Sequence, residues 1–129
     1  MQTIRVLVAD DHAGFRSTLT SFLRLQPGVE VVGEVGDGYA VVEQATALDP
    51  DLILVDVRMP RVNGIDAARE IKRLHPDTHV VVMSAGGQEM YRTMALQNRA
   101  DAFFEKSSLK SSLQSLLASF RHRPQPLAA

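Results

Sequence analysis

Residues 51–64 read D-L-I-L-V-D-V-R-M-P-R-V-N-G, and the rest of the chain is organised around this stretch. The apolar run Leu52–Val55 ends abruptly at Asp56. A run this apolar is typical of a strand that is buried on both faces, as in parallel sheets. The dipeptides Met59-Pro60 and Asn63-Gly64 predict a turn before the next helix. Because open α/β sheets bind ligands at the carboxyl ends of their strands, Asp56 is the first candidate site residue.

The chain alternates between two kinds of apolar pattern. Short apolar runs predict five strands: Ile4–Ala9, Val29–Val32, Leu52–Val57, His79–Met83 and Ala102–Glu105. Apolar residues at helical spacing predict five helices: around Phe15–Leu23, Val41–Leu48, Ile65–Leu74, Met90–Ala95 and Leu109–Phe120. We expect Met90 and Met94 to face the core with Tyr91 and Ala95. The alternation predicts an α/β fold, a doubly wound five-stranded parallel sheet whose strand ends share one edge.

Composition and charge restrict the class of protein. A chain of 129 residues with 45% hydrophobic and 22% charged residues is expected to form one soluble domain, over residues 1–121. We interpret residues 122–129 as a flexible C-terminal tail or a linker stump. The absence of cysteine excludes disulfides and thiolate zinc sites, and the net charge of −1 gives no general attraction to nucleic acid. Without a leader or a membrane span, a cytoplasmic location is expected.

Polar groups follow four of the five predicted strands: Asp10-Asp11, Asp56, Ser84 and Lys106. Each could be an ordinary flanking residue, but together they converge on one edge of the sheet. Two carboxylates ~4 Å apart repel by about 4 kcal/mol at an effective dielectric constant of ~20, so a cation is needed. All-oxygen ligands favour Mg²⁺ over zinc, while a lysine and a hydroxyl suit a phosphoryl group. The set therefore predicts a phosphoryl-transfer site.

His12 and the glycines after the second strand have simpler interpretations. We expect His12 to be a solvated residue at the start of a helix rather than a metal ligand. The series Gly33, Gly36 and Gly38 does not match the dinucleotide-binding fingerprint, so we expect turn and helix-entry glycines there.

Four motifs stand out in this arrangement: D-D-H at 10–12, D-V-R-M-P-R-V-N-G at 56–64, S-A at 84–85 and A-D-A-F-F-E-K at 100–106. Together they resemble the motifs of response-regulator receiver domains of two-component signalling. The opening V-L-V-A-D-D-H and the later V-E-V-V-G-E are most similar to receivers of NarL/LuxR-class transcription regulators. The resemblance implies the flavodoxin-like receiver fold with strand order 2-1-3-4-5.

The resemblance also implies roles for the acids. Asp56 would accept a phosphoryl group from a phosphohistidine of a sensor histidine kinase or a phosphotransfer protein. Asp10 and Asp11 would bind Mg²⁺ together with Asp56 and the backbone carbonyl of Arg58. The protein would then be no enzyme in the usual sense, since it would catalyse only its own phosphorylation and dephosphorylation.

Three further residues receive roles from the resemblance. Lys106 would pair with Asp56 and then with the phosphoryl group. Ser84 and Phe103 would form the switch, the hydroxyl moving towards the phosphoryl group and the ring turning inward. A homodimer formed on phosphorylation is compatible with this, and neither nucleic acid nor membrane would contact the domain itself.

Alternatives remain at this point. An aspartyl-phosphate hydrolase of the dehalogenase type would need D-x-D after its first strand, whereas the acids here are adjacent. A receiver that binds a partner without phosphorylation would not need the five matching residues. The chain could also be the receiver fragment of a NarL/LuxR-type DNA-binding regulator, since no helix-turn-helix follows residue 121. Finally, Arg99 stands where such receivers usually have glycine, and we expect Asn98 to take the left-handed conformation there instead.

Overall fold

The structure is a computed structural model that describes residues 3–86 and 89–121, and strands and helices alternate throughout. The strands are β1 (Ile4–Ala9), β2 (Val29–Val35), β3 (Leu52–Asp56), β4 (His79–Ser84) and β5 (Ala102–Glu105). The helices are α1 (Ala13–Arg24), α2 (Gly38–Leu48), α3 (Gly64–Leu74), α4 (Glu89–Gln97), the short 3-10 helix η1 (Lys106–Ser108) and α5 (Leu109–Arg121). The predicted tail, residues 122–129, lies outside the described residues. No helix in the described ranges is long and apolar enough to cross a membrane.

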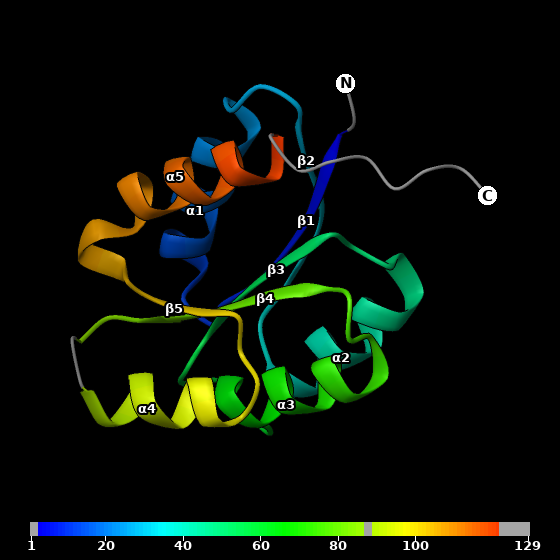
Figure 1. Ribbon diagram of the computed structural model, residues 1–129, viewed down its shortest axis with the longest axis vertical. Helices are drawn as coiled ribbons and strands as arrows, with labels where there is room; N and C mark the ends of the chain where they lie inside the picture. The colour runs from blue at the N-terminus through cyan, green and yellow to red at the C-terminus, as the bar shows by residue number, and fades with distance from the viewer. Residues whose placement is uncertain (1–2, 87–88, 122–129) are drawn as a thin grey trace.

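All five strands are parallel and form one sheet in the order β2-β1-β3-β4-β5. Helices α1 and α5 cover one face, and α2, α3 and α4 cover the other (Figure 1). The predicted doubly wound α/β fold and its strand order are confirmed. Because the strands are parallel, their carboxyl ends lie along one edge, which brings Ala9, Asp56, Ser84 and Glu105 to the same side of the sheet.

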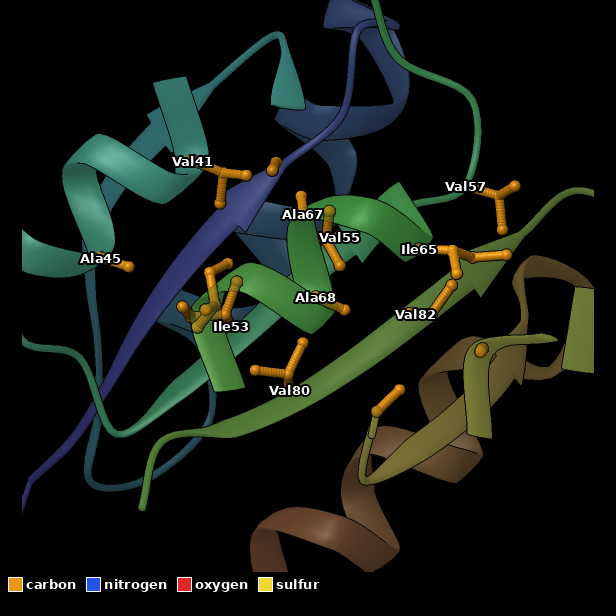
Figure 2. Close-up of a cluster of buried hydrophobic side chains, with 14 of the residues drawn as sticks. Val41, Ala45, Ile53, Val55, Val57, Ile65, Ala67, Ala68, Val80 and Val82 are labelled. Carbon is orange, nitrogen blue, oxygen red and sulfur yellow. The ribbon is translucent and has the colours of Figure 1, made fainter. Parts of the chain in front are cut away.

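Strand β3 is the centre of the hydrophobic core, and all five of its residues are buried. Alternate residues face opposite sides: Ile53 and Val55 pack under α2 and α3, whereas Leu52 and Leu54 pack under α1 and α5. Figure 2 shows the first of these clusters, with Ile53 and Val55 lying close to Ala67 and Ala68 of α3. The apolar run of the central strand therefore follows from burial on both faces.

Strand boundaries differ from the prediction in three places, and in one of them the fourth strand continues one residue beyond Met83, to Ser84. The second strand continues three residues beyond Val32, to Val35, and Gly33 lies within it rather than in a turn. Its pairing with β1 is irregular between Val6 and Leu7, at the point where Gly33 comes opposite Leu7. A methyl group on Gly33 would lie 3.0–3.2 Å from the side chains of Leu48 and Leu7, so glycine fits a crowded strand rather than a free loop. The third strand ends at Asp56, one residue before the predicted end.

Helix α4 is packed less deeply than the sequence predicted. Met90 and Met94 are 62% and 41% exposed, so the expectation that they fill the core is wrong. Ala95 alone of its described residues is buried, and Tyr91 is half-buried. The helix lies over the outer part of the sheet beside β5, where there is less core surface to cover (Figure 1).

The residue after α4 also corrects a prediction. Arg99, not Asn98, has the left-handed backbone conformation, with φ 74°. Two backbone hydrogen bonds close the turn there, from Arg99 to Leu96 (3.2 Å) and from Ala100 to Ala95 (3.0 Å). The turn therefore keeps its usual position and tolerates the strain of a non-glycine residue, about 1–2 kcal/mol.

A buried lysine ties the end of α3 to β4 and β5. The Lys72 ammonium donates to the backbone carbonyls of Pro76 and Thr78, both at 2.9 Å, and pairs with the Asp101 carboxylate at 3.0 Å. The same carboxylate accepts the Val80 backbone N–H at 2.7 Å. Because both charges are satisfied, this link fixes β5 against the rest of the sheet.

Gly64 is one of two described positions, with Gly38, where the fold leaves no room for a side chain. A methyl group there would lie 1.9 Å from the backbone oxygen of Asp56. We expect Gly64→Ala to lower the free energy of unfolding by about 1–3 kcal/mol, the usual range for overpacking. Urea unfolding followed by circular dichroism would measure it.

Gly14→Ala is the matched control, since no atom lies within 4 Å of the added methyl group and Gly14 is in a helix. Its stability should stay unchanged or rise by up to about 1 kcal/mol. Equal stabilities for the two variants would contradict the packing argument.

Candidate functional site

Asp10, directly after β1, is fully buried and yet fully hydrogen-bonded. One carboxylate oxygen accepts the His12 backbone N–H at 2.8 Å, and the other accepts the Lys106 ammonium at 2.6 Å. Its own backbone N–H donates to Val35 at 3.0 Å, and its carbonyl accepts from Arg16 at 2.6 Å. Every polar group of the residue is therefore held in place, which is the condition for burying a carboxylate.

Asp56, at the end of β3, shares the same lysine. The Lys106 ammonium lies 3.1 Å from a carboxylate oxygen of Asp56, which is 4% exposed. Lys106 follows β5 directly, and its ammonium also lies 4.0 Å from the centre of the Phe15 ring. One ammonium therefore balances two buried carboxylates, and the site carries an excess of negative charge.

The pKa of Asp56 lies above its ordinary value of 3.8. Burial is the main cause, and the neighbouring charge of Asp10 adds to it. Lys106 and the backbone N–H of Arg58 act in the opposite direction and do not outweigh burial. The Asp56 carboxylate is thus destabilised in the folded protein, and further positive charge near it would be favourable.

Asp11 completes an acidic cluster at the edge of the sheet. Ligand atoms of Asp10, Asp11, His12 and Asp56 all lie within 4.8 Å of one another. Asp11 is exposed at the mouth of the site, and the His12 ring nitrogen Nδ1 lies 3.1 Å from its carboxylate. His12 is 70% exposed, as expected of a solvated residue, but it contacts the acids more closely than the sequence suggested. The three carboxylates supply the oxygen donors that Mg²⁺ prefers.

The remaining predicted residues flank this cluster. Ser84 ends β4, is 5% exposed, and its hydroxyl accepts the Gly86 backbone N–H at 3.3 Å. Phe103 lies on β5 and is buried, with the guanidinium of Arg92 5.1 Å from the centre of its ring. The ring belongs to the core under α3 and α4.

Arg58 lies two residues after Asp56 and is exposed. Its guanidinium donates to the Tyr91 hydroxyl of α4 at 3.2 Å and lies 5.9 Å from the centre of that ring. The hydrogen bond to Tyr91 is the main reason why the pKa of Arg58 is raised, and the charge of Asp56 adds to the rise. Arg58 and Tyr91 also line a groove of about 730 Å³ that reaches Asp11.

Sequence reasoning missed two residues that support the site. Phe15 was assigned to a helix face only, yet its ring packs against the Lys106 ammonium. Phe15 and Lys106 lie on different elements, so helical spacing does not reveal this contact. Arg16 holds the carbonyl of Asp10, and this contact spans two elements, so no local pattern could have shown it.

Comparisons with known proteins agree with this geometry. The sequence pattern of the response regulator receiver domain matches residues 6–118, so the chain belongs to the receiver domain family of two-component response regulators. It is 37% identical over 103 residues to the transcriptional regulatory protein DegU of Brevibacillus brevis. It is 38% identical over 102 residues to the chemotaxis protein CheY of Thermotoga maritima. These matches cover 80% and 79% of the chain, but 44% of DegU and 84% of CheY.

A solved structure extends the comparison to three dimensions. The signal receiver domain of the response regulator NarL from Mycobacterium tuberculosis superposes with a TM-score of 0.87 and 34% sequence identity, covering 95% of this chain and 100% of that domain. The predicted similarity to NarL/LuxR-type receivers is confirmed. Because the chain belongs to the receiver domain family, the alternative of a dehalogenase-type hydrolase is not retained.

The raised pKa of Asp56 predicts a pH-dependent stability. Below about pH 3.8 the side chain is protonated in both the folded and the unfolded state, and as the pH rises through the higher folded-state pKa its ionisation destabilises the fold. We therefore expect Asp56→Asn to raise the free energy of unfolding at pH 7 by roughly 1 kcal/mol. The gain should shrink as the pH falls below the folded-state pKa.

Urea titrations at several pH values would measure this difference. Asp77→Asn, at an exposed position between α3 and β4, is the control for removal of a carboxylate. A gain for Asp56→Asn that is no larger at pH 7 than at pH 3.8, or that Asp77→Asn reproduces, would contradict the prediction.

Proposed function

We propose that this receiver domain accepts a phosphoryl group on Asp56 from a phosphohistidine of a sensor kinase or a phosphotransfer protein, in a reaction that requires Mg²⁺. One observation carries the proposal: two buried carboxylates share a single ammonium, with a third carboxylate at the mouth of the site. Such a site has unbalanced negative charge and an exposed side from which a cation and a phosphodonor can enter.

The residues present fit a magnesium ion. Asp10, Asp11 and Asp56 provide oxygen ligands from two neighbouring strands, and the backbone carbonyl of Arg58 would add a fourth. The bound ion would neutralise the carboxylates and the oxygens of the incoming phosphoryl group. His12 remains a neighbour of the acids in this proposal, not a ligand.

The chain's own groups would then carry the reaction. A carboxylate oxygen of Asp56 attacks phosphorus, the O–P bond forms, the N–P bond of the phosphohistidine breaks, and the donor imidazole leaves. Lys106 already faces both carboxylates and would follow the new charge on Asp56. Asp10 keeps the lysine in place throughout, because its own position is fixed by hydrogen bonds from three residues, His12, Arg16 and Val35.

Ser84 and Phe103 are the proposed switch. The Ser84 hydroxyl lies on the strand beside β3; its oxygen accepts the Gly86 N–H, and its proton can be donated to a phosphoryl oxygen. Full inversion of a 1:99 equilibrium requires about 5.5 kcal/mol, whereas one hydrogen bond to a charged group supplies about 1.5–3 kcal/mol. Other contacts to the phosphoryl group must therefore contribute, with Lys106 the first of them.

The kinase would approach the exposed side of the site. We expect it to contact α1 and the loops Arg58–Val62 and Lys106–Ser108, because these surround Asp56.

Transcriptional control is a further candidate output, supported by the name of DegU, which is more than twice as long as its matched region. The match to most of CheY equally supports a receiver that acts alone, and the open reading frame beyond Ala129 would distinguish them.

Incubation with acetyl phosphate and Mg²⁺ tests the proposal. We expect intact-mass spectrometry to show the addition of one phosphoryl group to the wild type. No addition should occur when Mg²⁺ is chelated beforehand, and none should occur in Asp56→Asn. Lys106→Ala should be phosphorylated more slowly by about tenfold or more, because a charged contact to the phosphoryl group is removed.

Asp77→Asn serves again as the control and should react like the wild type. If the wild type takes up no phosphoryl group, or Asp56→Asn behaves like it, a receiver that acts without phosphorylation would replace the proposal. Catalytic hydrolysis of a phosphomonoester would instead favour a phosphatase.

Ser84→Ala tests the switch separately from phosphorylation. With Mg²⁺ present, we expect its affinity for beryllofluoride, a phosphoryl mimic, to fall by about 10- to 100-fold, because one hydrogen bond to a charged group is lost. Ser84→Thr keeps the hydroxyl and should retain an affinity close to that of the wild type. An unchanged affinity in Ser84→Ala would remove Ser84 from the switch.

A further inference from the structure

Arg58 connects the phosphorylation site to α4 by a route that does not pass through Ser84 or Phe103. Arg58 follows Asp56 by two residues, and its guanidinium donates to the Tyr91 hydroxyl at 3.2 Å. The contact therefore joins the residue two places after the proposed phosphoacceptor to the third residue of α4.

Two features make this contact exchangeable. Arg58 is exposed, and it lies only two residues after Asp56. A phosphoryl group would add negative charge and several acceptor oxygens at Asp56, and guanidinium groups bind such oxygens more strongly than a neutral hydroxyl. Tyr91 and a phosphoryl group on Asp56 would thus compete for the same donor.

Helix α4 is the element that can respond to such competition. Ala95 is its one fully buried residue among those described, and Met90 and Met94 are exposed. A helix with so few buried contacts shifts at a lower energetic cost than its neighbours. Loss of the Arg58 contact would remove one of its few polar attachments to the loop after β3.

We propose that Tyr91 is a positioning residue for Arg58: it holds the guanidinium on α4 in the resting protein, and a phosphoryl group on Asp56 withdraws it, so that phosphorylation releases α4. This inference rests on the proposed phosphorylation of Asp56. It identifies one of the additional contacts that the switch requires.

The chain contains a matched control pair on the same edge of the sheet. Arg61 lies 4.8 Å from the centre of the Tyr39 ring and pairs with Asp37 at 3.3 Å. This second arginine–tyrosine pair joins the same loop to the start of α2. If any arginine–tyrosine pair near this edge affected the site around Asp56, substitutions in the Arg61–Tyr39 pair and in the Arg58–Tyr91 pair would have equal effects on it.

The experiment is a beryllofluoride titration with Mg²⁺, followed by amide NMR, on the wild type, Tyr91→Phe, Arg58→Gln and the double variant. We expect Tyr91→Phe to bind beryllofluoride up to about fivefold more tightly, because the competing hydrogen bond is absent. In the Arg58→Gln background, Tyr91→Phe should have no further effect on affinity.

The NMR signals of α4 provide the second measurement. In the wild type, beryllofluoride should shift amide signals of residues 89–97, and in Arg58→Gln these shifts should be smaller while those of Ser84 and Lys106 persist. Tyr39→Phe should behave like the wild type in both measurements.

The outcomes separate this proposal from the proposed function. A wild type that binds beryllofluoride, with Tyr91→Phe binding it equally or less tightly, would overturn the role of Tyr91 and leave the phosphorylation of Asp56 standing. Identical effects of Tyr91→Phe and Tyr39→Phe would overturn it as well. Failure of the wild type to bind beryllofluoride would overturn both.

Discussion

The arrangement of this protein depends on one ion pair network, in which Lys106 faces the carboxylates of Asp10 and Asp56. Two carboxylates buried at the edge of a sheet repel each other, and a single ammonium balances only one of their charges. Lys106 reaches both carboxylates because it directly follows β5 and its ammonium lies over the Phe15 ring. The remaining negative charge favours the binding of a cation, and the proposed phosphoryl transfer would use that property.

The fold supplies the precision that this network needs. Parallel strands bring residues from distant parts of the sequence to one edge, and the buried core on both faces of β3 fixes their separation. Asp10 illustrates the result, because its side chain and backbone are held by His12, Arg16, Val35 and Lys106. A carboxylate that is fixed in this way can orient its neighbours without moving itself.

Much of this was predictable from sequence because the signals are local or topological. The apolar run before Asp56 defines the central strand, and the alternation of strands and helices places Asp10, Ser84 and Lys106 on the same edge. Glycine at position 64 follows from the tight turn that brings α3 against the backbone of Asp56.

Other features could not be predicted because they depend on packing between distant elements. Periodicity places Met90 and Met94 on one side of a helix, but it does not reveal that the outer part of the sheet leaves this side uncovered. The left-handed Arg99 contradicts backbone preference, and the surrounding hydrogen bonds determine it instead. Likewise, the contact between Arg58 and Tyr91 joins residues 33 positions apart and has no sequence signature.

The buried Lys72 has a mechanical consequence for the outer half of the molecule. Its contacts join the end of α3, the segment before β4 and the residue before β5, so the elements on either side of α4 are linked to one another. The lightly attached helix between them can then change its tilt without loosening the sheet. A ligand bound at the acidic edge would then displace α4 and leave the sheet and the other helices almost unchanged.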